Sequence, residues 1–129
     1  MINLAKKLFP ICRSLTGDGN RKTLEILKKE VPELTLYEIP SGKKFYDWVV
    51  PDEWNVKDAY ISANGKKIID FKKNNLHLVG YSIPFNGIIK KKELFKRLHT
   101  LPNQKNAIPY VTSYYKKDWG FCVSYNDFK

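Results

Sequence analysis

The ten residues from Phe45 to Trp54 constrain the fold more than any other stretch of the chain. They include four aromatic side chains, two of the three tryptophans of the protein, and Pro51. Leaving so much apolar surface in water is unfavourable, at roughly 25 cal/mol per Å². We therefore expect another part of the fold to cover this stretch.

The stretch also divides the chain into two parts with different patterns. Before it, apolar residues at helical spacing predict a helix over residues 3–15, with a kink or break near Pro10. A second helix is expected to start at Asp18 as its N-cap and to end before Pro32. Alternating apolar residues then predict a strand over residues 33–39.

After the stretch, short strands and turns dominate. Asn64-Gly65 between two apolar runs predicts a hairpin of residues 59–61 and 67–71. Apolar residues at helical spacing predict one surface helix at residues 91–98. Runs of residues that favour β structure predict three further strands, at 76–81, 108–115 and 119–125. The fold class is therefore α+β.

Ser124 is expected to cap one more helix, and the sequence ends at Lys129 soon after that helix begins. We therefore expect the chain to be a fragment of a longer protein.

The bulk composition excludes several classes of protein. The 129 residues suit one ordinary domain, and 43% of them are apolar, which is enough to build a core. No apolar run is long enough for a membrane span or resembles a signal peptide, so we expect a cytoplasmic protein with no membrane partner. In that compartment Cys12 and Cys122 are expected to stay reduced.

The net charge of +10 first indicates a nucleic-acid binder. However, the positive charge is nearly all lysine, distributed along the chain as pairs. Arginine is the better reader of bases and phosphates, so this distribution favours a solvated surface, and no nucleic-acid partner is expected.

The residue types that carry catalysis show no catalytic pattern. His77 and His99 lie in no metal-binding motif, and we interpret them as a half-buried strand histidine and a residue at a helix C-terminus. Neither the serines nor Cys122 shows a nucleophile signature. We therefore predict no catalytic and no metal-binding residue in this chain.

Three carboxylates near the tryptophans leave one alternative to a chain without catalytic residues. Asp47, Asp52 and Glu53 provide an acid and base pair if the tryptophans wall a pocket. The competing interpretation, which we favour, is that Asp52-Glu53 is an exposed surface turn.

Taken together, six strings of the sequence resemble the N-terminal part of a bacterial aminopeptidase-like family of unknown function. These strings are LFPICRSLTGDG at 8–19, DWVVPDEWN at 47–55, NLH at 75–77, LHTLP at 98–102, IPYVTSYY at 108–115 and WGFC at 119–122. Members of that family are similar to zinc-dependent exopeptidases, with a small β-rich domain inserted near the N-terminus and a winged helix at the C-terminus.

The resemblance implies a division of the chain into three parts. Residues 1–40 are expected to supply two helices and a strand of an α/β peptidase-like core, residues 41–105 the inserted β-rich domain, and residues 106–129 the truncated return to the core. Trp48, Trp54, Trp119 and Pro51 are then structural anchors.

The family's metal ligands are expected after residue 129. The chain alone should therefore bind no cofactor, lack zinc and be inactive. Its partners would be the peptidase core and winged helix of its own polypeptide, and a homo-oligomer is left open.

A second hypothesis is a free-standing binding module for single-stranded nucleic acid or acidic polysaccharide. Two tyrosines directly followed by two lysines, Tyr114-Tyr115-Lys116-Lys117, motivate it.

Overall fold

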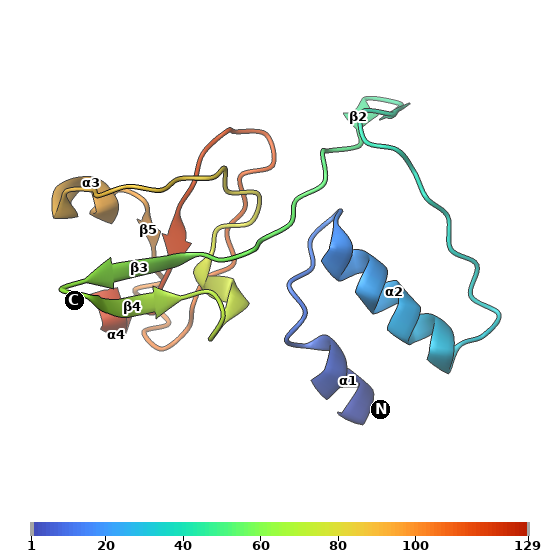
Figure 1. Cartoon of the computed structure of the whole chain (residues 1–129), viewed down its shortest axis with the longest axis horizontal. Coiled ribbons are helices and arrows are strands. Elements are labelled where there is room, and N and C mark those ends of the chain that lie inside the picture. The colour runs from blue at the N-terminus through green and yellow to red at the C-terminus, as the bar shows by residue number, and fades with distance from the viewer. Residues whose placement is uncertain (1, 129) are drawn as a thin grey trace. The chain divides into compact units, whose positions relative to one another are not determined.

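The computed structural model describes residues 2–128 as two compact units, Met1–Lys57 and Asp58–Lys129 (Figure 1). Both helices and short strand pairs are present, which confirms the α+β class. The division after Lys57 is an observation about compactness, and the domain borders expected near residues 41 and 106 stay predictions. Each unit is described separately below.

The first unit begins with two helices. Helix α1 spans Ile2–Leu8 and helix α2 spans Asp18–Glu30. The first helix is shorter than predicted because Pro10 has no amide hydrogen and its ring disfavours helical geometry in the residue before it. The Arg13 side chain donates from Nη1 to the Leu8 carbonyl oxygen at 2.6 Å and so satisfies one exposed carbonyl at the helix end.

The predicted strand at residues 33–39 does not form. These residues adopt no regular structure, and the side chains of Tyr37 and Ile39 are 84% and 52% exposed. A strand requires backbone hydrogen bonds to a neighbouring strand, and the described residues place none beside this segment.

The aromatic stretch contributes a small hairpin to the first unit. Strand β1, Lys44–Phe45, pairs antiparallel with strand β2, Trp48–Val49. Val50, which follows, is 7% exposed. The cover expected for this stretch is incomplete within the described residues, because Tyr46 is 97% exposed and Trp48 is 40% exposed.

The second unit opens with the predicted hairpin. Strand β3, Tyr60–Ala63, pairs antiparallel with strand β4, Lys66–Asp70. Asn64 and Gly65 form the turn with φ of 50° and 75°, which is the left-handed geometry that Asn-Gly favours.

Two of the three other predicted strands are replaced by different structure. Residues 76–81 form the 3-10 helix η1, Asn75–His77, followed by single bridges at Leu78 and Gly80. Residues 108–115 contribute only the bridge of Thr112 to Gly80. Residues 119–125 keep a short strand, β6, Phe121–Cys122.

The predicted helix at 91–98 is also shorter than expected. Helix α3 spans Lys91–Phe95, and the next residues, Leu98–His99, form strand β5, which pairs parallel to β6. His99 therefore lies in a strand and not at a helix C-terminus.

Helix α4, Tyr125–Phe128, confirms the predicted cap at Ser124. The Ser124 hydroxyl donates to Asp127 Oδ2 at 2.6 Å and accepts from the Asp127 amide at 3.1 Å.

The core of the second unit lies along β6. Phe121, Cys122 and Val123 are buried together with Val79, which comes from the segment after η1. In residues 2–128 no helix is long and apolar enough to cross a membrane.

Candidate functional site

Two of the six family-like strings meet in the first unit. The loop that precedes α2 packs against residues 52–55, and we call this contact the Arg21–Glu53 junction. It comprises Thr16, Gly17, Asp18 and Arg21 on one side and residues 52–55 on the other. The Thr16 hydroxyl donates to the Asp52 carbonyl at 3.0 Å, and the Asp18 amide donates to Asn55 Oδ1 at 2.8 Å.

Two glycines permit this close approach. Gly17 has a φ of 105°, and a Cβ there would lie 2.6 Å from the Trp54 carbonyl oxygen. A Cβ on Gly19 would lie 1.9 Å from the Cys12 carbonyl oxygen. Gly17 is also the N-cap of α2, so the predicted Asp18 cap is wrong by one residue, and Asn55 caps the helix from outside.

The junction bears on one of the three carboxylates, Glu53, and both interpretations of the group stay predictions. Arg21 forms a two-pronged ion pair with Glu53, with Nη1 at 3.0 Å from Oε2 and Nη2 bonded to Oε1. The hydrogen bond from Arg21 lowers the pKa of Glu53. A general acid needs the opposite shift, so Glu53 does not suit the role of the acid in such a pair.

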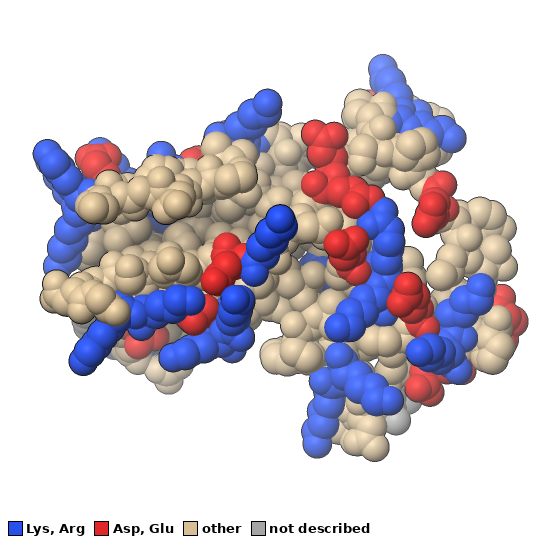
Figure 2. All heavy atoms as spheres, in the orientation of Figure 1, with Lys and Arg blue, Asp and Glu red and all other residues tan. Residues whose placement is uncertain are grey.

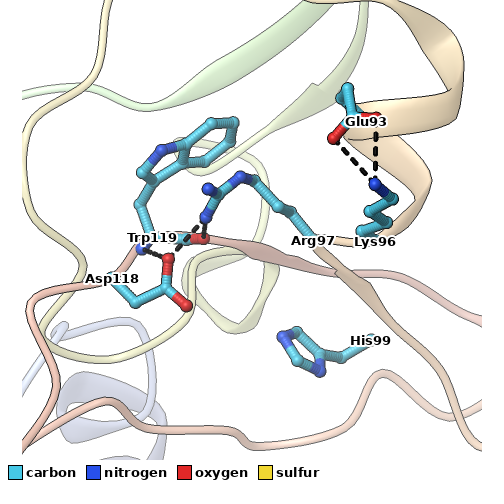
Figure 3. Close-up of a pocket in the computed structure, with 6 residues that line it drawn as sticks. All are labelled: Glu93, Lys96, Arg97, His99, Asp118 and Trp119. Atoms are coloured by element: carbon cyan, nitrogen blue, oxygen red, sulfur yellow. Dashed lines mark hydrogen bonds and ion pairs between the residues drawn. The ribbon is translucent and has the colours of Figure 1, made fainter.

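The second constellation is an open hollow of about 230 Å³ in the second unit (Figure 3). Six residues from α3, β5 and the segment before β6 line it: Glu93, Lys96, Arg97, His99, Asp118 and Trp119. Figure 3 shows two ion pairs at its rim and His99 standing apart from both.

Both cations at the hollow are already neutralised. Arg97 Nη1 lies 2.5 Å from Asp118 Oδ1 and donates to the Trp119 carbonyl at 3.1 Å. Lys96 Nζ lies 3.0 Å from Glu93 Oε1. The Trp119 amide and then Arg97 lower the pKa of Asp118, so that carboxylate stays charged. Both cations of the hollow are therefore paired with carboxylates.

The remaining candidate residues have structural partners. His77 Nδ1 lies 2.8 Å from the Cys122 carbonyl oxygen, and because a carbonyl only accepts, Nδ1 is the donor. Burial raises the pKa of Cys122 to about 11, which keeps its thiol neutral and unreactive. Both cysteines are free. Among residues 2–128 no three His, Cys, Asp or Glu side chains gather in a group that suits a metal ion.

The four predicted anchors differ in their surroundings. Trp119 stacks on Phe85 at 4.4 Å between ring centroids, and the Arg97 guanidinium lies 4.5 Å from the Trp119 ring. Trp54 and Pro51 are half-buried in the first unit, whereas Trp48 is exposed. The anchor role of all four stays a prediction.

The ion pairs of Arg21 and Arg97 were not found from sequence. Their partners are 32 and 21 residues away, and no local pattern links them. The only available signal was that the chain has three arginines among many lysines, and arginine is the cation suited to two-pronged pairing.

Comparison with known proteins now adds to this geometry. A family model described as a domain of unknown function (DUF2172) matches residues 53–129. A protein of Clostridium acetobutylicum named "Putative polysaccharide biosynthesis protein with aminopeptidase-like domain" is 53% identical over 127 residues, which are 98% of this chain and 29% of that protein.

A solved structure is also similar to this chain. The crystal structure of a "putative peptidase" from Clostridium acetobutylicum superposes with a TM-score of 0.92 at 53% identity, covering 98% of this chain and 30% of the solved one. The resemblance to an aminopeptidase-like family is thereby confirmed, and the free-standing binding module is not favoured. The chain spans less than a third of the length of both proteins.

Proposed function

Because the chain belongs to the family described as a domain of unknown function (DUF2172), we propose that it forms the N-terminal segment of a cytoplasmic, zinc-dependent aminopeptidase-like hydrolase. The observation that carries this proposal is the 53% identity over 98% of the chain to a protein with an aminopeptidase-like domain, of which the chain covers only 29%. Peptidase core and winged helix would then belong to the remainder of the polypeptide.

The described residues do not fit a zinc site. A catalytic zinc needs three protein ligands, whereas residues 2–128 hold no group of three candidate side chains. We therefore assign zinc binding to the remainder of the protein and no step of its chemistry to this chain.

The role proposed for this chain is to complete and shape the hydrolase. Residues 33–39 alternate in polarity and have no neighbouring strand among the described residues, which suits addition to a sheet supplied by the rest of the protein. The second unit would belong to the inserted β-rich domain and its return to the core, where it would border substrate access.

A chimera tests this proposal directly. In the Clostridium acetobutylicum relative, the 127 matched residues are replaced by those of this chain. We expect the chimera to be monodisperse, to bind zinc at stoichiometric level by elemental analysis, and to hydrolyse aminoacyl p-nitroanilides at a rate similar to that of the parent. The chain alone should show neither zinc nor hydrolysis.

The relative lacking its matched segment is the control and should be insoluble or inactive. Stoichiometric zinc in the chain alone would overturn the assignment of the metal to the remainder. A parent and chimera that both bind zinc but hydrolyse no aminoacyl substrate would overturn the aminopeptidase-like activity while leaving the structural role intact.

A further inference from the structure

One loop of the second unit exposes apolar side chains in sequence. Residues 83–89 run Ile-Pro-Phe-Asn-Gly-Ile-Ile, and we call them the apolar loop. Ile83 is 39% exposed, Phe85 is 52% exposed, and Ile88 is fully exposed. Figure 2 shows an uncharged tan ridge where Figure 1 places the chain that leads into α3.

The base of this loop is fixed to the unit. The Ile83 amide donates to the Asp118 carbonyl at 3.0 Å, and the Phe85 ring lies nearly parallel to Trp119, at 11°. Trp119 is in turn covered by Arg97 at 4.5 Å. The loop is therefore an anchored projection, and its tip at Ile88 does not pack into the core.

Three consecutive lysines follow the loop directly. Lys90, Lys91 and Lys92 are all exposed, and they begin α3. The acidic residue that follows, Glu93, is already paired with Lys96 at 3.0 Å. Figure 2 shows Lys and Arg atoms bordering the α3 end of the ridge. Within residues 2–128 none of these three lysines forms an ion pair, although Lys91 Nζ lies 5.3 Å from the Phe95 ring. The result is an apolar projection edged by positive charge.

This combination selects one class of partner. A single nucleic-acid strand needs aromatic faces on which bases stack, whereas the most exposed side chain here is the aliphatic Ile88. Apolar side chains that project beside lysines match the boundary between the acyl chains and the anionic headgroups of a bilayer, because the two attractions add there. We propose that the apolar loop and Lys90–Lys92 dock this unit on an anionic lipid surface, with Ile88 inserted at the headgroup level and Phe85, stacked on Trp119, holding the base of the loop.

The proposal revises the expectation of no membrane partner. That expectation considered only spanning segments and a signal peptide, and docking on a surface needs neither. The docking proposal is independent of the hydrolase role, because every residue on which it depends lies between positions 83 and 119.

Vesicle sedimentation tests the proposal with the whole chain. We expect binding to phosphatidylcholine vesicles that contain phosphatidylglycerol, weak binding to pure phosphatidylcholine, and loss of affinity as salt is raised. Ile88→Ser should weaken binding about fivefold or more at every salt concentration. The double variant Lys90→Gln/Lys92→Gln should weaken it about fivefold per lysine at low salt and little at high salt.

Two matched variants serve as controls. Ile68→Ser removes an isoleucine that is 61% exposed on β4, and Lys28→Gln/Lys29→Gln removes two lysines from the last turn of α2. Both should bind vesicles like the wild type, and circular dichroism should show that all four variants fold alike.

Three results would overturn the proposal. One is equal vesicle binding by Ile88→Ser and Ile68→Ser. Another is equal affinity for vesicles with and without phosphatidylglycerol. The third is a dimer in analytical ultracentrifugation that Ile88→Ser dissociates while vesicle binding is unchanged, because the loop would then be an interface between protein chains.

Discussion

Glu53 and Arg21 are 32 residues apart, yet their side chains form the two-pronged bond that holds α2 against the end of the aromatic stretch. Both side chains are solvent-exposed, so salt and water weaken the pair. The pair contributes to stability through its position, because it lies beside the hydrogen bonds of Thr16 and Asp18 and beside the close approach of Gly17 to Trp54.

This pair predicts a pH dependence of stability. Because Arg21 lowers the pKa of Glu53 in the folded state, the pair stabilises the fold above the unfolded pKa of about 4.3. That stabilisation is lost as the pH falls through the lower, folded pKa. Glu53→Gln should therefore lower the melting temperature at pH 7 and lower it progressively less as the pH falls towards 3.

Glu30→Gln, at the end of the same helix, is the matched control and should change the melting temperature little at either pH. Thermal melts from pH 3 to pH 7 followed by circular dichroism make the comparison. An equal deficit of Glu53→Gln at pH 3 and pH 7 would contradict the ion-pair interpretation.

At the scale of elements, sequence predicted what local chemistry determines. The β3–β4 hairpin follows from Asn64-Gly65, whose φ values suit the tight turn, and the break after α1 follows from Pro10. The cap of α4 follows from the Ser124 hydroxyl. Each of these depends on residues within a few positions of one another.

Elements that depend on distant partners were missed. Leu98 fits the spacing of α3, yet it pairs with Phe121 in a parallel strand pair. Residues 76–81 have the composition of a strand, but Asn74 accepts the Leu76 amide and starts a 3-10 turn. The candidate site follows the same rule, because both arginine pairs join residues more than twenty positions apart and required the fold.

The predicted anchors can be ranked at this scale. Trp119 contacts Phe85 and Arg97, whereas Trp48 is 40% exposed on a two-residue strand. We expect Trp119→Ala to destabilise the second unit by about 2–3 kcal/mol, less than a fully buried tryptophan would. Trp48→Ala should cost under about 1 kcal/mol.

Urea denaturation monitored by circular dichroism measures both variants against the wild type. A larger loss of unfolding free energy for Trp48→Ala than for Trp119→Ala would contradict the ranking and would place the main anchor in the β1–β2 hairpin.

Considered as a whole, the chain buries little apolar surface for its length. Among residues 2–128 the buried apolar side chains are Val50, Val79, Pro109, Phe121, Cys122 and Val123. Many other large apolar side chains are more than a third exposed, including Phe9 at 82%. Such surface is usually covered by another part of the same protein or by a partner.

We therefore expect the isolated chain to bind the dye ANS at neutral pH and to melt over a broad temperature range. In the chimera with the Clostridium acetobutylicum relative, the dye signal per chain should fall because the remaining polypeptide covers the exposed residues. A sharp cooperative melt and a monodisperse, dye-free chain would contradict this expectation.

The position of β6 has a consequence for the order of folding. Hairpin β3–β4 closes a turn of two residues, but β5 must wait for β6, which pairs with it from more than twenty positions further along the chain. During synthesis on the ribosome, the second unit cannot complete its core until Phe121 to Val123 have emerged. Until then Val79 and the rest of the nascent unit stay open to chaperones and proteases.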